Sequence, residues 1–476
     1  MKILNAAFCV LALAGGTLRA QEQVVELNRG VELFLHDNYL AAEKHGVEVE
    51  PATAEKYVKN PVLTAQHPWE EGYIGYVTLV QDGDEKTYKM WYEVLDPKTD
   101  WGRLLYAVSK DGLTWEKPAL DVHEFQKSRK NNIVFVGSGK KKVKAFAVIK
   151  DYSDPDPGKR YKMMHHLWDF RGRGIAVTHS PDGIQWTVST FLNLVGGFDS
   201  HNIFFFDDRL GYYVGYFRHF VMGRRSIGRS VSYDGYHWAN PVLVHQPDAQ
   251  DPPGLTLYTP SIFKHSKANN VYILYTAVID HSTDLVHVQL GVSRDGIAWH
   301  RFRKPLLSLG KKGEWDSGVI YAAPSEVSIG DRTAVYFQGN SIKHGFGGQP
   351  AIGVAFLPEF SFAGLKAEGE GTIVTQPLRL FHHDDRQALY LIANAENGSI
   401  QAEALDAKGA VIPGFSRELS RPVRGKGSLL ALEWKTRTIA DEVFQKGLFR
   451  LKLWLNNATV YGLSVKRLPR SPKSAN

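Results

Sequence analysis

The chain has 476 residues, of which 12% are aromatic, with 44 glycines and 22 prolines. This length and composition predict a β-rich protein with a sizeable core, in two domains. The formal charge of +7 is spread along the chain without a single basic stripe, which argues against nucleic acid as a partner. The simplest interpretation is a solvated basic surface. The alternative is an acidic carbohydrate substrate, because basic residues cluster at 140–144, 171–173 and 224–229.

The first 20 residues are typical of a secretory signal. A basic start at residues 1–3 precedes an apolar run to Ala14 and a small-residue site ending at Ala20, too short and wrongly flanked for a membrane anchor. We expect cleavage near Ala20 and export to the periplasm or the extracellular space, with no membrane anchor. Cys9 is the only cysteine and lies in this segment, so we expect no disulfide and no thiolate metal site in the mature chain.

Four-stranded units are predicted from residue 31 onward. Residues 31–40 indicate a strand and an extended approach segment. The first unit then has strands over 74–80, 88–92 and 104–108, followed by a hairpin and a short outer strand. Later units scan in the same way, with second strands over 271–275 and 334–337.

One pattern, Ser-x-Asp-Gly-x-x-Trp, occurs four times, at 109–115, 180–186, 232–238 and 293–299. Repetition of this kind is the signature of a propeller or solenoid. Asp-Gly between strand-like runs predicts a hairpin, and the tryptophan is expected to pack between neighbouring repeats. We therefore interpret the four aspartates as equivalent turn residues, not as catalytic or metal-binding groups. A degenerate copy at 357–362 indicates a fifth unit.

The predicted fold class is all-β: a five-bladed β-propeller over residues 31–375, closed by the N-terminal segment, followed by a C-terminal β-sandwich. The sandwich is predicted over 377–466, where shorter alternating strands take over. The basic tail, 467–476, has too few apolar residues to pack and is predicted to be disordered.

In a propeller, the loops before the inner strands and those joining second to third strands line one central funnel. Asp199, Asp316 and Glu70 lie in such loops and are the candidate catalytic carboxyl groups. The alternative is that each only binds backbone amides at the start of a strand. The returning loops hold further candidates: Glu93, His166, Asp169, Arg218, His219, Asp280, His281 and His344. Four acids fall in turns at the opposite end and are interpreted as turn residues: Asp82, Asp151, Asp208 and Asp331.

Aromatic and polar residues of the same loops are candidates for binding a sugar, although any one of the aromatic rings has blade packing as its alternative. The predicted substrate-binding residues are Trp69, His201, Arg218, Tyr258, Trp315 and His344. No pair among the 18 histidines has helical ligand spacing, so we expect no metal and no cofactor.

Several motifs in order, including Leu-Phe-Leu-His-Asp-Asn-Tyr-Leu from residue 33, Phe-Asp-Ser-x-Asn from residue 198 and Trp-Asp-Ser-Gly from residue 315, together resemble a known family. The chain is similar to secreted bacterial proteins labelled glycoside-hydrolase-family-32-like, over roughly Leu33 to Val465. The resemblance implies a five-bladed propeller with a trailing sandwich. The invertase hallmarks Asn-Asp-Pro-Asn, Arg-Asp-Pro and Glu-Cys are missing, so no catalytic role is carried over.

The first functional hypothesis is an exported glycoside hydrolase acting on a poly- or oligosaccharide. Such cleavage uses two carboxyl groups, one protonated to donate to the leaving oxygen and one ionised to attack or to activate water. The second is a non-catalytic carbohydrate-binding propeller. The third is a phosphorylase or an enzyme for anionic sugars, and export counts against phosphorolysis because the sugar phosphate would be lost.

Overall fold

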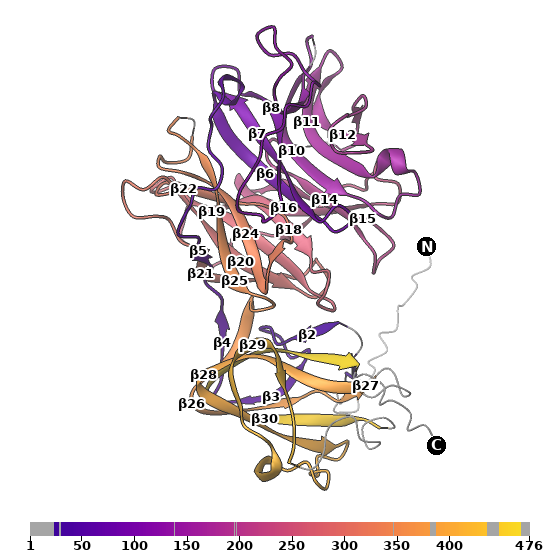
Figure 1. The fold of residues 1–476 in the computed structure, drawn as a ribbon, viewed down its shortest axis with the longest axis vertical. Helices are drawn as coiled ribbons and strands as arrows, with labels where there is room; N and C mark the ends of the chain where they lie inside the picture. The colour runs from indigo at the N-terminus through magenta and orange to yellow at the C-terminus, as the bar shows by residue number, and fades with distance from the viewer. Residues whose placement is uncertain are drawn as a thin grey trace, which may run out of the picture.

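The computed structural model describes residues 23–27, 30–137, 139–194, 196, 198–345, 347–380, 387–435 and 447–467. Figure 1 shows two bodies: an upper one of several sheets and a lower one of long curved strands. The predicted signal segment, 1–20, and nearly all of the predicted tail lie outside the described residues. Among the helices of the described residues, none is long and apolar enough to cross a membrane.

Three sheets of the upper body each contain four antiparallel strands that are consecutive in sequence. Each is a meander, the arrangement that short connections between successive strands favour. The first sheet is β6 (Tyr73–Asp82), β7 (Thr87–Asp96), β8 (Trp101–Ser109) and β9 (Ile133–Val136). The second is β10 (Lys142–Lys150), β11 (Tyr161–Asp169), β12 (Gly172–Ser180) and β13 (Thr190–Phe191). The third is β14 (Ile203–Asp207), β15 (Tyr212–Val221), β16 (Arg224–Ser232) and β17 (Val242–His245).

Two further meanders are joined by one parallel bridge, Val286 to Val319. The first is β18 (Leu255–Lys264), β19 (Tyr272–Asp280), β20 (Leu285–Ser293) and β21 (His300–Leu307). The second is β22 (Val319–Ala322), β24 (Arg332–Asn340) and β25 (Ala351–Pro358), with the short β23 (Ser328–Ile329) beside β24. Its outer strand is β5 (Glu55–Lys56), which comes from the N-terminal segment. This pairing is the closure expected from the sequence.

Successive meanders contact one another in a closed ring. β6 contacts β10, β10 contacts β14, β14 contacts β18, and β24 of the last meander contacts β6 again. Figure 1 shows these sheets side by side in the upper body. The upper body is therefore an all-β, propeller-like ring.

The repeated Ser-x-Asp-Gly pattern occupies equivalent places, because its serine is the last residue of β8, β12, β16 and β20. The aspartate carboxylate accepts hydrogen bonds from the backbone two and three residues on, as Asp111 does from Leu113 and Thr114. The serine hydroxyl accepts from the glycine N–H at 2.9 Å in all four copies. All four glycines have φ between 73 and 79°, a conformation that side chains disfavour. The pattern is thus a turn, as predicted.

These turns also bind the neighbouring meander. The indole N–H of Trp91 donates to the Gly183 carbonyl at 2.7 Å, and the Tyr216 hydroxyl donates to the Gly296 carbonyl at 2.8 Å. The turn acids Asp82 and Asp151, expected to be structural, accept in the same way from a tyrosine of the following sheet. Polar bonds from buried aromatic residues therefore fix one sheet against the next.

The lower body is one nine-stranded sheet around its own apolar core. Two long strands dominate it, β28 (Gln387–Asp406) and β30 (Phe449–Arg467), and they pair antiparallel along their length. The remaining strands are β26 (Ala363–Thr375), β27 (Leu378–Leu380), β29 (Val423–Ala431), β1 (Val25–Leu27), β2 (Val31–Leu33), β3 (Ala41–His45) and β4 (Glu48–Pro51). The described chain also contains three short 3-10 helices, which are η1 (Pro68–Glu70), η2 (Pro157–Lys159) and η3 (Arg417–Leu419).

The pairing differs from the domain limits expected from the sequence. Residues 31–51 and 363–375, expected in the propeller, form strands of the lower sheet through β2–β4 and β26, and β1 joins the same sheet. The described chain starts in the lower body with β1, crosses to the upper body through β5 and returns after β25 (Figure 1). Short strands such as β3 and β4 carry no local sign of their partner, because the pairing is with residues more than 300 positions away.

Candidate active site

A cavity of about 260 Å³ lies where the inner strands of all five meanders converge. Every meander contributes at least one polar side chain to it. The lining residues are Tyr73, Gly75, Tyr76, Glu93, Leu95, Asp100, Lys144, Ala145, Asp199, Ser200, Arg218, Arg225, Tyr258, Tyr321, Gln338, His344 and Gly345.

Irregularities in three inner strands shape this cavity. The register shifts between Ile74 and Val77 in β6, between Lys144 and Ala147 in β10, and between Leu257 and Pro260 in β18. Such bulges re-aim side chains next to active sites. They place Tyr76 and Tyr258 on the cavity wall, where the two hydroxyl groups lie 3.3 Å apart.

Glu93, in β7, is the buried acid of the cavity. Its Oε1 accepts the Ala145 backbone N–H at 2.6 Å, while Oε2 has no hydrogen-bond partner among the described residues. Burial raises the pKa of Glu93 to about 8, against the opposing effects of the Ala145 hydrogen bond and the Lys144 charge. Gly75 and Gly102 make room for this carboxyl group, because a Cβ at either position would lie 3.2 or 2.9 Å from its oxygens. Glu93 is therefore protonated at neutral pH.

Asp199, in the loop before β14, is the ionised acid. Its Oδ1 lies 2.9 Å from Lys144 Nζ and its Oδ2 lies 3.1 Å from Arg173. Burial opposes ionisation, but the Lys144 hydrogen bond and the charges of Lys144 and Arg218 outweigh it, so the pKa of Asp199 falls below its ordinary value. Arg218 also donates to the Asp199 backbone carbonyl at 2.7 Å, which fixes the loop.

The bulge in β10 joins the two acids. Lys144 holds Asp199 through its side chain, and the next residue, Ala145, holds Glu93 through its backbone N–H. Ala145 has φ of 57°, an unusual conformation for a residue with a side chain. Lys144 also pairs with Asp100, in the turn between β7 and β8. The strained backbone at Ala145 therefore helps to place two carboxyl groups in one cavity, with Glu93 protonated and Asp199 ionised.

Neutral polar groups also line the cavity. The Tyr321 hydroxyl lies 2.6 Å from His344 Nδ1, and Gln338 donates to the Tyr73 hydroxyl at 2.8 Å. Burial, followed by the charges of Arg225 and His281, lowers the pKa of His344, so its ring is neutral at neutral pH. These residues offer hydroxyl and amide groups suited to hydrogen bonds with sugar hydroxyls.

Of the site residues predicted from the sequence, four line the cavity: Asp199, Arg218, Tyr258 and His344. From the basic clusters of the sequence, Lys144 and Arg225 also line it. Arg224 does not, and its guanidinium donates to the Leu255 carbonyl at 2.9 Å.

Glu70 and Asp316 lie outside the lining. The Glu70 carboxylate is fully buried and is held by Lys117 and the Tyr92 hydroxyl, both at 2.6 Å, and by two backbone N–H groups of its own loop. Asp316 is buried and binds Lys56 at 2.5 Å, which fastens the closing strand β5. The backbone contacts of Glu70 are those of the alternative stated above, with a lysine added, whereas the Asp316 carboxylate is held by its ion pair with Lys56.

The remaining predicted sugar-binding residues also lie outside the lining. Trp69 donates to the Asn132 side chain at 2.7 Å and stacks on His67. Trp315 stacks on Phe337, inside its own meander. His201 is buried directly behind the cavity wall, where it stacks on Tyr76 with ring centroids 4.7 Å apart. These rings pack strands, which was the alternative for each aromatic residue.

Glu93 was among the candidates of the returning loops, but it was not selected from the sequence as a catalytic carboxyl group. It lies inside an apolar strand pattern, Met-Trp-Tyr-Glu-Val-Leu from residue 90, and a charged residue in such a run is a signal for a buried functional group. The bulge that supplies its Ala145 partner has no comparable signature.

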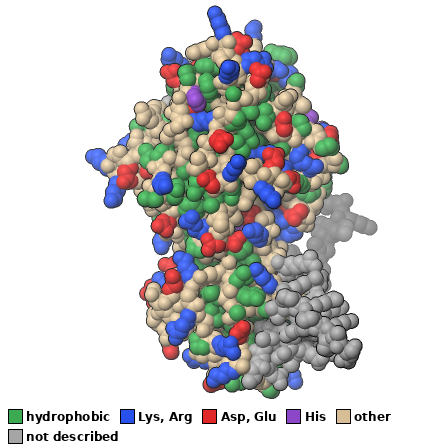
Figure 2. Space-filling view, in the orientation of Figure 1, with side chains coloured by type: hydrophobic (Ala, Val, Ile, Leu, Met, Phe, Trp, Pro, Cys, Tyr) green, Lys and Arg blue, Asp and Glu red, His purple; other side chains and the backbone are tan. Residues whose placement is uncertain are grey.

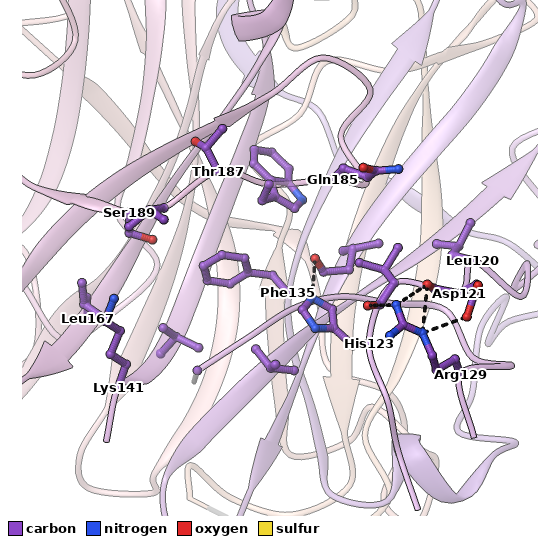
Figure 3. A pocket seen from close by; sticks show the side chains of 17 residues that line it. Leu120, Asp121, His123, Arg129, Phe135, Lys141, Leu167, Gln185, Thr187 and Ser189 are labelled. Carbon is purple, nitrogen blue, oxygen red and sulfur yellow. Dashed lines mark hydrogen bonds and ion pairs between the residues drawn. The ribbon is translucent and has the colours of Figure 1, made fainter. Parts of the chain in front are cut away.

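A second cavity, of about 560 Å³, lies between β9 and the segment 185–189 (Figure 3). Figure 3 shows Phe135 pointing into it, with His123, Gln185 and Thr187 around it. Its one acid, Asp121, is exposed and pairs with Arg129 at 2.8 Å. Without a second carboxyl group, this cavity does not offer the acid pair that glycoside cleavage uses.

Among the described residues, no group of three or more His, Cys, Asp or Glu side chains is arranged to hold a metal ion. The side chains that line the described cavity carry carboxyl, guanidinium, ammonium, imidazole, amide and hydroxyl groups.

No protein-family model and no curated protein matches the chain. Among solved structures, a glycosyl hydrolase from Bacteroides ovatus is 16% identical over 65% of this chain and 94% of that one, with a TM-score of 0.46. Another comes from the GH130 family of mannoside phosphorylases, which contains glycoside hydrolases that target β-1,2 mannosidic linkages in Candida mannan. It is 14% identical over 65% of this chain and 95% of that one, with a TM-score of 0.45. Neither is described as a family-32 protein, and at this level of similarity the function is inferred from the cavity itself.

Proposed function

We propose that the protein is an exported glycoside hydrolase that cleaves a glycosidic bond of a poly- or oligosaccharide, with Glu93 as general acid and Asp199 as base or nucleophile. One observation supports this above all: two carboxyl groups in one cavity have pKa values moved in opposite directions, to about 8 for Glu93 and below the ordinary value for Asp199. Such pairs divide acid and base roles between them.

The proposed reaction follows from these protonation states. Glu93 donates its proton to the leaving glycosidic oxygen as the bond from that oxygen to the anomeric carbon breaks. Asp199 takes a proton from a water whose oxygen bonds to the anomeric carbon, or it attacks that carbon directly and water releases the sugar afterwards. In both routes one water is consumed, two sugar fragments leave, and Glu93 regains its proton from Asp199, from water or from solvent.

We further infer that the carbohydrate is acidic. Three cations, Lys144, Arg218 and Arg225, line the cavity, against the carboxyl groups of Asp100 and Asp199 and the protonated Glu93. Export to the periplasm or the extracellular space rests on the signal-like residues 1–20 and remains a proposal from the sequence. The face of the molecule shown in Figure 2 carries side chains of both signs, interspersed.

For the fold, we propose that the five meanders are the five blades of a propeller of the family-32-like kind, and that the lower sheet folds into a β-sandwich. The domain limits follow the strand pairing: a ring domain over 55–358, and a second domain that combines 25–51 with 363–467.

The test is hydrolysis of a panel of neutral and uronic-acid polysaccharides, measured as release of reducing ends. The wild type is compared with Glu93→Gln, Asp199→Asn and the control Asp121→Asn, whose carboxylate is exposed and lies at the second cavity. We expect turnover by the wild type and the control and its loss in both site variants. Saturable binding of a glycan by the wild type, without any turnover, would instead support a non-catalytic carbohydrate-binding protein.

A further inference from the structure

Arg225 is a cation of the cavity without a partner among the described residues. It is the second residue of β16 and lies half-buried, with its guanidinium carbon 5.1 Å from the centroid of the Tyr258 ring. Neither an ion pair nor a hydrogen bond joins its side chain to the described part of the chain, and its buried Nε is unsatisfied. The other cations near the acids are engaged: Lys144 with Asp100 and Asp199, and Arg173 with Asp199.

A half-buried guanidinium without a counter-ion is energetically unfavourable unless a ligand supplies the missing charge or hydrogen bonds. Withdrawing a charged group from water without a counter-ion or hydrogen bonds is unfavourable. The carboxylates of Asp100 and Asp199 are already paired, and Glu93 is neutral because it is protonated. The protein therefore supplies no anion for Arg225 from the described cavity lining.

The position of the Arg225 guanidinium over the Tyr258 ring indicates which chemical group would bind it. A guanidinium whose flat face lies over an aromatic ring keeps its edge available for two parallel hydrogen bonds, which match a carboxylate. Arg225 also contributes positive charge at Arg218 and His344, whose pKa values are both lowered, first by burial. These three side chains therefore converge on one part of the cavity. At about 260 Å³ the space suits a small ligand, since drug-sized pockets measure roughly 300–1,000 Å³.

We propose that Arg225, seated on Tyr258, binds a carboxylate carried by the sugar residue in the cavity, so that the substrate is a uronic acid glycoside. This inference rests on the proposed hydrolase function and adds the residue that selects the substrate. Inorganic phosphate shares the oxyanion chemistry, and the experiment separates the two sources.

The first arm compares matched substrates, uronic-acid oligosaccharides and the same oligosaccharides with the carboxyl group reduced to an alcohol. For Arg225→Gln we expect kcat/KM on the acidic form to fall about 10- to 100-fold, the effect of losing a hydrogen bond to a charged group. The reduced form should be cleaved equally by variant and wild type. Arg225→Lys keeps the charge without the planar fork, so its loss should be intermediate. Arg171→Gln is the control, because Arg171 is half-exposed and pairs with Asp169 at 2.7 Å, outside the described cavity lining.

The second arm measures binding without turnover, by calorimetric titration of D-glucuronate, D-galacturonate, D-glucose and inorganic phosphate into the wild type and both Arg225 variants. Binding of a uronate that Arg225→Gln abolishes supports the inference even if no glycan is cleaved. Circular dichroism and the thermal midpoint verify that the variants fold.

Three outcomes would overturn the inference. Equal cleavage of acidic and reduced substrates by the wild type would remove the carboxylate subsite while leaving the hydrolase intact. Cleavage that requires phosphate, with phosphate binding lost in Arg225→Gln, would assign Arg225 to a phosphate. Absence of both turnover and uronate binding would refute the inference together with the proposed function.

Discussion

Replacing Glu93 by glutamine tests the central assignment, because the amide has nearly the same shape but no proton to donate. The Oε1 position still accepts the Ala145 N–H, and Gly75 and Gly102 still leave room for the side chain. A general acid contributes roughly 10²–10⁴-fold to the rate. We therefore expect kcat/KM on a cleaved glycan to fall by about that factor. In the wild type, kcat/KM should decline as the pH rises through about 8, where Glu93 loses its proton.

Glu93→Gln should also change how the free energy of unfolding depends on pH, and the raised pKa of Glu93 fixes the direction of that change. The pKa of Glu93 is raised in the folded protein from an ordinary value of 4.5 to about 8. Between these values the folded state holds a proton that the unfolded state has released, so the free energy of unfolding decreases as the pH rises. At about 1.4 kcal/mol per pH unit, this group accounts for roughly 4 kcal/mol between about pH 5 and pH 8. The glutamine variant lacks this contribution.

The assay is urea denaturation of both proteins at several pH values between about 5 and 8.5, together with the pH profile of kcat/KM. We expect the stability of the variant relative to the wild type to increase steadily with pH over this interval. Parallel stability curves would show that Glu93 is ionised in the folded protein across the range. A variant that keeps more than a tenth of the wild-type kcat/KM would show that Glu93 is not the proton donor.

Three further predictions concern other parts of the molecule. Asp199→Asn should lower kcat/KM by about 10²–10⁴-fold and remove the acidic limb of the pH profile, and a retained acidic limb would assign that limb to another group. Tyr216→Phe leaves the Gly296 carbonyl unpaired between two sheets and should lower the free energy of unfolding by about 1–3 kcal/mol. The exposed Tyr233→Phe should change it by less than about 0.5 kcal/mol, and equal effects would contradict the packing argument. Burial, opposed by Asn269 and Arg294, raises the pKa of Glu32 to about 7, so stability should decline as the pH rises from about 4.5 through 7. Glu32→Gln should make that decline shallower in thermal unfolding, because Glu93 still contributes over the same range, and an unchanged slope would show that Glu32 does not contribute to it.

The sequence determined the repeated turns because their chemistry is local. Ser109, Asp111 and Gly112 bond to one another within four residues, and the same bonds recur in each copy. The strands flanking these turns follow from alternating apolar runs, so the meanders were predictable, and closure of the ring by the N-terminal segment was expected, although the strand β5 itself was not. The funnel position of Asp199, Arg218, Tyr258 and His344 followed from the same rule, since it depends only on which loops return to one end of a meander.

The tertiary structure alone decided which acids are available for chemistry. Glu70 and Asp316 occupy loops of the expected kind, yet Lys117 and Lys56, 47 and 260 residues away, hold their carboxylates. Glu93 gains its raised pKa from burial and its backbone partner from a bulge in β10, 52 residues away. The lower sheet likewise takes β3 and β4 from the N-terminal segment. Protonation state and strand partnership depend on neighbours brought together by folding, and a linear sequence carries no local record of them.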